Sequence, residues 1–496
     1  MTKTNSKKAL LSSAFALVLS AAMLIGTTFA WFTDTASTGV NKIVSGNLKV
    51  DIIGENSDSH IEKLNFKKTA ATDAEAGAAI LWEPGCRYLT EGFRIANKGN
   101  LALKWKAQVN MNNIINGKVE GSTIAKDGKS LLDVIDFYVV TSTDKNAEAV
   151  AIENFVGNLT AGAKSGVYYI NGVMQTTAGN DYQGLTLDGI TITVVATQDT
   201  VENDSFNNQY DKDAEYPILV TTGDELQAIV SNATAPVNIV LANSITTNNF
   251  VIPADKDVTL DLNGRTVTNA GSHTILNKGH LTLTDSSTDK SGQIISLKGN
   301  TAALRNGDNA VCVVEGGTIS RDGANGNTWH VVENFGKMTF NGGKVVLKNG
   351  NGFAITNGWN YFDPGASTTH AVMEINALEL DTDSSGIKNC RYGDLTVNDA
   401  TVTSTGYWAL SNDYLGTAVI NGGTLTSNSF KAVSNGAAMT VNGGTFDGTE
   451  GLFVQSYATS TVLNGGTFTN MNVDALSSYV GTGHTAQQSG TSVIIK

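Results

Sequence analysis

The chain has 496 residues, with 33 Lys and Arg against 46 Asp and Glu, and a formal net charge of −13. This acidic composition argues against nucleic acid and anionic lipid as partners, because both carry negative charge themselves. The length exceeds what one compact core accommodates, so we expect two domains or a repeat architecture. The three cysteines, Cys86, Cys312 and Cys390, are too few and too odd in number for a disulfide framework.

The first 30 residues have the pattern of an export signal. Three lysines precede an apolar run over residues 9–25, and residues 28–30 (TFA) offer small side chains where a signal peptidase reads the chain. We expect cleavage between Ala30 and Trp31, which removes three Lys and no acid and so changes the net charge from −13 to −16. The alternative is a retained membrane anchor, because the run is nearly long enough to span a bilayer. Cleavage predicts a secreted protein of the cell surface or extracellular matrix, without membrane attachment.

Residues 31–203 are expected to form a β-sandwich or jelly roll. Stretches with strand-like alternation are separated by polar, glycine-containing turns, which is typical of antiparallel β-structure. The strand-like stretches are 46–53, 91–99, 101–111, 134–142 and 190–198. A polar, acidic segment, 204–220, follows them, and we expect it to link this domain to the rest of the chain.

Several motifs of this first domain resemble the TasA/camelysin family of secreted Gram-positive matrix proteins. The motifs are Trp31-Phe32-x-Asp34 after the signal, Ser45-Gly46-x-Leu48 at a strand start, a Pro-Gly turn at 84–85, and the closing strand ITITVVATQ. They occur in the order found in the family. The resemblance implies a jelly-roll domain and processing by a dedicated signal peptidase during export.

The same resemblance implies assembly into matrix fibres, in which the freed N-terminal segment joins a neighbour's sheet. Such a strand gains main-chain hydrogen bonds at an unpaired edge, and a head-to-tail contact that does not close builds a filament. The candidate assembly strand comprises Phe32, Val40, Ile43, Leu48 and Val50. Fibre-forming members of the family lack the long region that follows here, which leaves cap, adhesin and matrix-decorating roles open.

Residues 221–496 are expected to form one solenoid domain, in which one coil repeats about nine times from Asn263 onward. Apolar residues recur at every second position and the pattern restarts every 21 to 35 residues, which predicts short strands that bury one face and must stack on neighbouring coils. One turn column reads Asn263, Thr284, Glu315, Asn341, Asn376, Asn398, Asn421, Asn442 and Asn464. A second column reads Asn277, Asn306, Asn334, Asn357, Asn389, Asn412, Asn435, Ser456 and Ser478. Thr222 and Glu225 predict a capping box for a helix, Asp224–Ser231, that covers the first coil.

The second column resembles the stacked asparagine ladder of pectate-lyase-like right-handed β-helices. In such a ladder, each side-chain amide satisfies backbone groups and its neighbours in the stack. The expected fold is therefore all-β: an N-terminal jelly roll or β-sandwich, followed by a single-stranded, right-handed, parallel β-helix of about nine coils. This scaffold carries lyases, hydrolases, adhesins and passive stalks, so the fold by itself assigns no function.

The sequence contains no recognisable catalytic or metal-binding constellation. Polygalacturonase-type chemistry needs two carboxylates at a defined separation, and Asp381 with Asp383 form only an isolated pair. Camelysin-like proteins have been labelled metallopeptidases, but zinc chemistry would want a His-Glu-x-x-His motif, which the six histidines do not provide. We expect no enzymatic activity, no metal and no cofactor, and a polysaccharide lyase or hydrolase is the third alternative.

Aromatic residues in or beside the turns of coils three to eight give the clearest binding signal. Rings next to Asn, Asp and Gly suit sugars, which stack on flat apolar faces and form hydrogen bonds sideways. The candidate glycan-binding residues are Trp329, Trp359, Tyr361, Tyr407, Trp408 and Tyr414. The alternative is that these rings pack over the exterior of the solenoid, or under the long inserts after Thr284 and Asn341.

The whole pattern predicts a secreted, non-enzymatic structural protein of the cell surface or biofilm matrix. Its expected partners are the signal peptidase, further copies or matrix fibres, and a glycan as candidate ligand. The main alternative is a solenoid adhesin or carbohydrate-binding protein whose first domain only accompanies export.

Overall fold

The computed structural model describes residues 47–61, 64–67, 80–110, 114–115, 118–119, 129–144, 147–151, 155–187, 191–199, 216–269, 271–322, 329–359 and 369–496. The export signal, the expected cleavage bond between Ala30 and Trp31, and the assembly residues Phe32, Val40 and Ile43 lie outside these ranges. The candidate Tyr361 also lies outside them.

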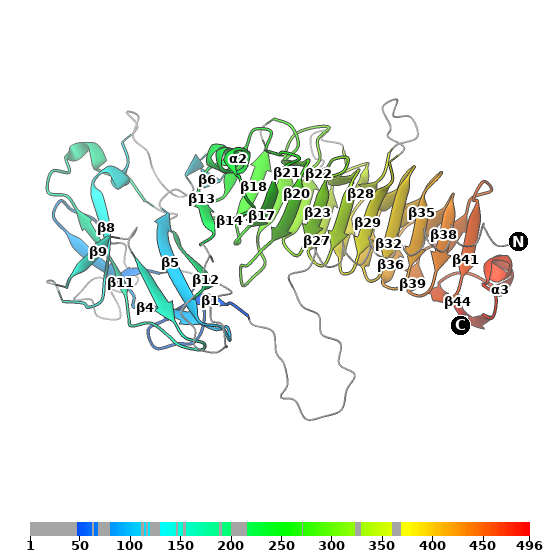
Figure 1. The fold of residues 1–496 in the computed structure, drawn as a ribbon, viewed down its shortest axis with the longest axis horizontal. Coiled ribbons are helices and arrows are strands. Elements are labelled where there is room, and N and C mark those ends of the chain that lie inside the picture. Colours follow the sequence, from blue (N-terminus) through cyan, green and yellow to red (C-terminus); the bar gives the residue numbers. More distant parts are fainter. Residues whose placement is uncertain are drawn as a thin grey trace, which may run out of the picture. The chain divides into compact units, whose positions relative to one another are not determined.

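The first domain consists of antiparallel strands in several small sheets (Figure 1). One sheet pairs β1 (Val50–Gly54) with β4 (Phe93–Asn97), and a second has the order β10 (Val156–Leu159), β5 (Leu103–Asn110), β12 (Thr191–Gln198). A third has the order β2 (Phe66–Lys67), β3 (Arg87–Thr90), β11 (Tyr169–Met174), β8 (Ile135–Val140), β9 (Ala149–Ala151), and β6 (Ile114–Ile115) pairs with β7 (Lys118–Val119). Two 3₁₀ turns, Leu131–Asp133 and Asn180–Tyr182, complete the described elements. Four of the five expected strand-like stretches contain one of these strands, and the fifth, 46–53, contains all of β1 except Gly54.

An aromatic cluster occupies the core of this domain. The Trp105 side chain is 1% exposed, and its ring centroid lies 4.8 Å from that of Phe155 in an edge-to-face arrangement. The Phe155 ring in turn lies 4.6 Å from Tyr168. Rings that alternate inward along paired strands supply most of the apolar area that a small β-domain can bury.

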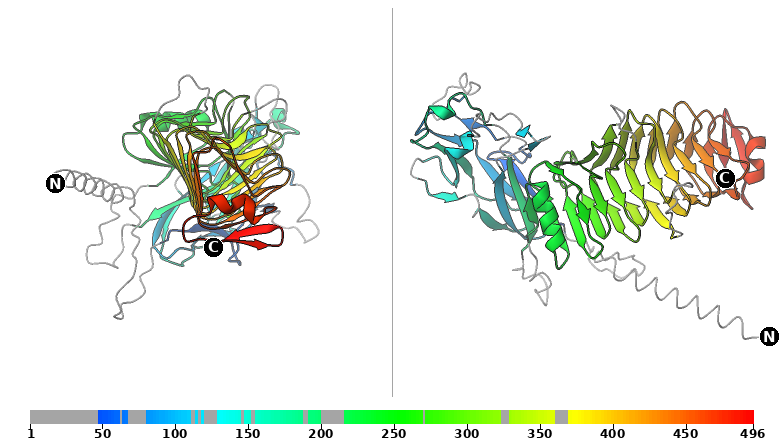
Figure 2. Two further views of the ribbon diagram at one scale, coloured as in Figure 1. Left: turned by 90° about the vertical axis from the view of Figure 1, so that its right-hand side faces the viewer. Right: turned by 90° about the horizontal axis from the view of Figure 1, so that it is seen from above.

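The second region, from β13 (Ile218–Val220) to β42 (Gly466–Phe468), is a parallel β-solenoid of about ten turns (Figures 1 and 2). Its eleven-stranded sheet contains β13, β14 (Val237–Leu241), β17 (Asp257–Asp261), β20 (His280–Thr284), β23 (Val311–Val314), β26 (Lys337–Phe340), β29 (Ala371–Ile375), β32 (Gly393–Val397), β35 (Thr417–Ile420), β38 (Ala438–Val441) and β41 (Ser460–Leu463).

The twelve-stranded sheet begins with ten parallel strands, and two antiparallel strands follow at its end. It contains β15 (Ile245–Thr247), β18 (Thr266–Asn269), β21 (Gln293–Ser296), β24 (Thr318–Asp322), β27 (Lys344–Lys348), β30 (Glu379–Thr382), β33 (Thr401–Ser404), β36 (Thr424–Ser427), β39 (Thr445–Asp447), β42, β44 (Ser492–Ile495) and β43 (Ala486–Ser489). The nine-stranded sheet contains β16 (Val251–Ile252), β19 (Ile275–Asn277), β22 (Leu304–Asn306), β25 (Val332–Asn334), β28 (Phe353–Asn357), β31 (Ser385–Asn389), β34 (Leu410–Asn412), β37 (Val433–Asn435) and β40 (Leu452–Val454).

Aliphatic side chains stack in register through the interior of the solenoid. Val397 pairs with Ile420, which pairs with Val441, and these side chains are at most 1% exposed. Cys312 lies in the same interior and is fully buried. Because each coil covers the apolar face of the next, the stack buries a core that no single coil could bury.

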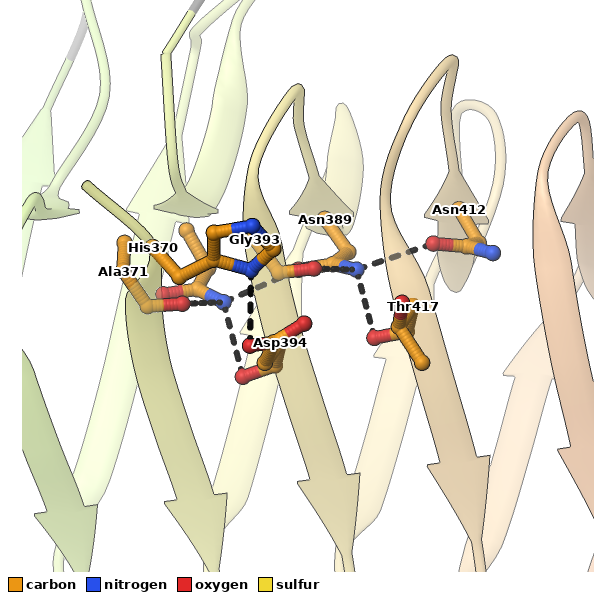
Figure 3. Close-up of polar contacts among 8 residues, drawn as sticks. His370, Ala371, Asn389, Gly393, Asp394, Asn412 and Thr417 are labelled. Atoms are coloured by element: carbon orange, nitrogen blue, oxygen red, sulfur yellow. Dashed lines mark hydrogen bonds and ion pairs between the residues drawn. The ribbon is translucent and has the colours of Figure 1, made fainter. Parts of the chain in front are cut away.

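Seven asparagines form a buried ladder where the nine-stranded sheet ends. The side-chain Nδ2 of each donates to Oδ1 of the next over 2.7–2.9 Å, and the series is Asn277, Asn306, Asn334, Asn357, Asn389, Asn412, Asn435. Figure 3 shows Asn389 and Asn412 of this series. The predicted ladder is thus confirmed over these positions, but Ser456 and Ser478 do not continue it. The register pairs Asn435 with Val454, and Ser456 lies two residues beyond that position.

A second ladder, which the sequence reading did not predict, runs along an exposed turn. In it, each Nδ2 donates to the Oδ1 of the preceding coil over 2.7–2.9 Å, and the series is Asn341, Asn376, Asn398, Asn421, Asn442, Asn464. Its donors point toward the N-terminal coils, whereas the buried ladder donates toward the C-terminal coils. The two ladders thus run along the turns at the two ends of the strands of the eleven-stranded sheet.

Both ends of the solenoid are covered. Helix α2 (Gly223–Asn232) is N-capped by Thr222, whose Oγ1 accepts a hydrogen bond from the Glu225 backbone N at 3.2 Å. The Glu225 carboxylate accepts in return from Thr221, one residue earlier than a standard capping box requires. At the other end, α3 (Val473–Leu476) and β44 follow the last coil, and Leu476 is buried in the solenoid core. Covered ends remove the unpaired edges that promote aggregation.

The solenoid also begins earlier than expected. Strand β13 pairs with β14 in parallel within the solenoid sheet, so Ile218–Val220 belong to the first coil and not to a linker ending at residue 220. The nine expected coils began with the row of Asn263, and a further coil of β14, β15 and β16 precedes that row, which accounts for the tenth turn.

Candidate functional site

Aromatic and charged side chains collect on the outer face of the nine-stranded sheet. In each strand, the residue before the ladder asparagine points away from the interior. In register, these residues are Arg305, Glu333, Thr356, Lys388, Ser411 and Ser434. We call the surface made by these residues and the aromatic residues beside them the outer face of the nine-stranded sheet.

A buried carboxylate lies near the N-terminal end of this face. Glu333 is 3% exposed, its Oε2 lies 3.0 Å from Arg305 Nη1, and its Oε1 accepts from Trp329 Nε1 at 3.0 Å. Burial raises the pKa of the Glu333 carboxyl, and the nearby Arg305 opposes that rise. The carboxylate is tolerated because both of its oxygens have charge-assisted or polar donors.

Arg305 connects this carboxylate to an aromatic pair. Its guanidinium lies 4.6 Å from the Phe335 ring centroid, and the Phe335 and Trp359 centroids are 4.4 Å apart. The Trp359 backbone N donates to Arg391 O at 3.0 Å, which ties the coil to the following one. Trp359 Nε1 and Arg391 Nε are buried without a hydrogen-bond partner, so this part of the face holds two unsatisfied donors.

A second aromatic cluster lies farther toward the C-terminus. The Trp408 ring stacks on Phe453 at 6.0 Å with an interplanar angle of 24°, and it meets Phe430 edge-on at 4.7 Å. Tyr407 lies 5.9 Å from Phe430 and keeps 57% of its surface exposed. Lys431 Nζ sits 3.7 Å from the Phe453 centroid. The cluster is thus a packed aromatic base with one exposed tyrosine.

Two further tyrosines lie at the other end of these strands, in the turns that follow them. Tyr414 is 45% exposed and follows strand β34, and Tyr457 is 55% exposed and follows β40. The Tyr457 ring lies over Gly436, where an added Cβ would come within 2.7 Å of the ring. A side chain at position 436 would therefore displace the end of this ring.

The structure therefore separates the predicted glycan-binding residues into groups. Trp329 and Trp359 belong to the charged cluster around Glu333, Tyr407 and Trp408 belong to the second cluster, and Tyr414 stands apart from both. The sequence reading missed Glu333, Arg305, Phe430 and Phe453. The signal that could have found Arg305 and Glu333 is their place one residue before a ladder asparagine, where the side chain must point outward.

Three cations on this face share one arrangement, in which each meets both a carboxylate and an aromatic ring. Besides Arg305, Lys388 pairs with Asp413 at 3.1 Å and lies 5.2 Å from the Phe353 ring. Lys431 pairs with Glu450 at 2.9 Å and covers the Phe453 ring. The charges on this face are thus mutually compensated and held in place by cation–π contacts.

Two histidines at the border of this face stay neutral. Ala302 N donates to His273 Nδ1 at 2.9 Å, and His330 Nδ1 lies 3.1 Å from Phe353 O. Burial lowers the pKa of each imidazole to about 4. Both rings therefore serve as uncharged links between coils at neutral pH.

Within the described ranges, no group of three His, Cys, Asp or Glu side chains is placed to hold a metal ion. Over the same part of the chain, no helix combines the length and the apolar content needed to cross a bilayer. No protein-family model, no curated protein and no solved structure matches the chain.

Proposed function

We propose that the protein is a secreted, non-enzymatic structural component of the cell surface or biofilm matrix, with a right-handed β-helix as its rigid display element. The observation that carries this proposal is the continuous interior of the solenoid, in which aliphatic columns and a buried asparagine ladder persist through successive coils. Such an interior favours stiffness and resistance to unfolding. The charged groups of the outer face are engaged in pairs, an arrangement suited to a stable surface more than to proton transfer.

The first domain is proposed to be a TasA-like jelly roll that supports assembly. Val50 pairs with Asn97 of its own chain, and Lys49 O accepts from Lys98 N at 2.7 Å. A segment donated to a neighbour would therefore lie before Asn47, and Val50 would form its attachment to the parent domain. Leu48 stands at the junction and is 39% exposed.

Electron microscopy of exported protein tests this assembly. We expect fibres from protein whose N-terminus, determined by sequencing, is Trp31, and no fibres after deletion of residues 32–46. A variant in which residues 32–46 are reordered keeps length and composition, and it should also fail to form fibres because the pairing pattern is lost. Fibres from the reordered variant would refute strand donation by this segment.

Carbohydrate recognition is the second candidate function. It is supported by the collection of aromatic rings on one of the three sheets, with three tyrosines at least 45% exposed. Screening the full chain on a glycan array, with Trp359→Ala and Trp408→Ala as variants, tests this candidate. Binding that neither substitution weakens would count against recognition by these clusters.

A further inference from the structure

The last three strands of the nine-stranded sheet differ from the strands before them. Upstream, the outward column carries Arg305, Glu333 and Lys388, whereas Ser411 and Ser434 occupy it on β34 and β37, and Phe453 occupies it on β40. The Gln455 side chain lies beside them, and its Nε2 donates to Ser434 Oγ at 3.2 Å. Ser434 is 3% exposed, so the half-buried Ser411 and Gln455 are the hydroxyl and amide groups that this part of the sheet presents in place of charges. We call Ser411, Ser434 and Gln455 the polar floor.

Aromatic rims border the polar floor on both edges. Tyr407, with Trp408 and Phe430 packed beside it, precedes the strands, and Tyr414 and Tyr457 follow them. The Tyr407 backbone is held by Ser404, whose Oγ donates to Tyr407 O at 2.9 Å. Rings fixed in this way lose little entropy when a ligand stacks on them.

The charges nearest to the polar floor are already compensated. Lys431 pairs with Glu450, and Lys388 pairs with Asp413. A polyanion would have to displace a carboxylate from either lysine before it gained an ion pair. Rings that supply stacking surface, next to hydroxyl and amide groups that supply hydrogen bonds, match the two faces of a neutral sugar.

We propose that the polar floor and its two aromatic rims bind a neutral polysaccharide chain. This inference rests on the carbohydrate-recognition candidate and narrows it to one surface and one class of polymer. Sugar rings stack on Tyr407 and Tyr457, and their hydroxyl groups exchange hydrogen bonds with Ser411 and Gln455. The charged cluster around Glu333 has no part in this binding.

Affinity electrophoresis of the full exported chain tests the proposal. Gels contain hydroxyethyl cellulose, laminarin or dextran as neutral polymers, or sodium alginate as a polyanion. At least one neutral polymer should retard the protein, and alginate should not. Each of Tyr407→Ala and Tyr457→Ala should weaken binding roughly fivefold, and together roughly twentyfold, from the usual value of an aromatic contact. Leu297→Ala, which removes another side chain that is 52% exposed, is the matched control and should change nothing.

A third variant tests the geometry of the rim. Gly436→Ala places a methyl group against the Tyr457 ring, so it should weaken binding about as much as Tyr457→Ala while the circular dichroism spectrum stays unchanged. Unchanged binding in both this variant and Tyr457→Ala would remove Tyr457 from the site.

Retardation by no neutral polymer, or equal retardation of the double tyrosine variant, would overturn the proposal. Alginate binding that Trp359→Ala abolishes would overturn it too, but would leave carbohydrate recognition standing at the other cluster. Sedimentation analysis tests whether a second copy of the chain occupies the rims. If the chain self-associates, the double variant does not, and no polymer binds, then the rims belong to a second copy and the proposal is overturned.

Discussion

Replacing Asn389 by Ala should destabilise the solenoid strongly. Its Nδ2 donates to Asn412 Oδ1 at 2.9 Å, to Gly393 O at 2.8 Å and to Thr417 O at 3.0 Å, and its Oδ1 accepts from Asn357 Nδ2 at 2.9 Å (Figure 3). The side chain is fully buried, so water cannot replace it. The two Nδ2 hydrogens serve these three acceptors, so the side chain makes about three full hydrogen bonds, and at about 1 kcal/mol for each we expect the free energy of unfolding to fall by about 3 kcal/mol.

The exposed ladder provides a matched control. Asn421 makes ladder bonds of the same length, 2.7 Å to Asn398 and 2.8 Å from Asn442, but water can reach its amide. Asn421→Ala should therefore cost less than about 1 kcal/mol. Urea titrations followed by circular dichroism at 218 nm (about the usual β-sheet minimum), with m-values compared, measure both variants. Equal losses in the two variants would refute the reasoning that burial gives the ladder its value.

Two further predictions concern charge. His273 has a folded pKa of about 4 against about 6.5 for the free side chain, so the unfolded chain binds the proton first and stability should fall as pH drops from about 6.5 to about 4, by roughly 1–3 kcal/mol. His273→Asn does not titrate, so its melting temperature should fall less between pH 7 and pH 4.5, and an unchanged slope would contradict this. Arg305→Ala leaves the buried Glu333 without its cation and should cost about 3 kcal/mol, whereas Lys431→Ala, whose partner Glu450 is 43% exposed, should cost under about 1 kcal/mol. Similar melting temperatures for these two variants would show that Glu333 does not need its partner.

The sequence predicted the solenoid well because its strongest signal is local and repeats. Period-two columns place Val397, Ile420 and Val441 in one stack, and the structure pairs them in register. The same prediction was wrong at Ser456, because the connection from β39 to β40 is shorter than in the preceding coils and the register places Val454 beside Asn435. When a column is extended with a fixed residue spacing, it assigns the wrong residue wherever a coil has a different length.

The composition of the outer face was harder to predict. Trp408 was recognised as aromatic, but its partner Phe453 is distant in sequence and meets it only through the register of stacked coils. Glu333 lies only four residues after Trp329, but its cation Arg305 comes from the preceding coil. The exposed asparagine ladder was visible as a column, yet the direction of its hydrogen bonds follows from side-chain rotamers that no sequence pattern specifies. Contacts between coils therefore set the limit of what the sequence alone reveals.

Disulfide trapping between neighbouring coils tests the stacked solenoid most directly. In a background in which Cys86, Cys312 and Cys390 are replaced by Ala, Thr403→Cys and Thr426→Cys place two thiols on adjacent strands in register, about 4.8 Å apart at Cα, within disulfide reach. We predict that this pair oxidises nearly completely, and that Thr403→Cys with Thr424→Cys, shifted by two residues, does not. Oxidation of the shifted pair alone would contradict the register on which the whole solenoid depends.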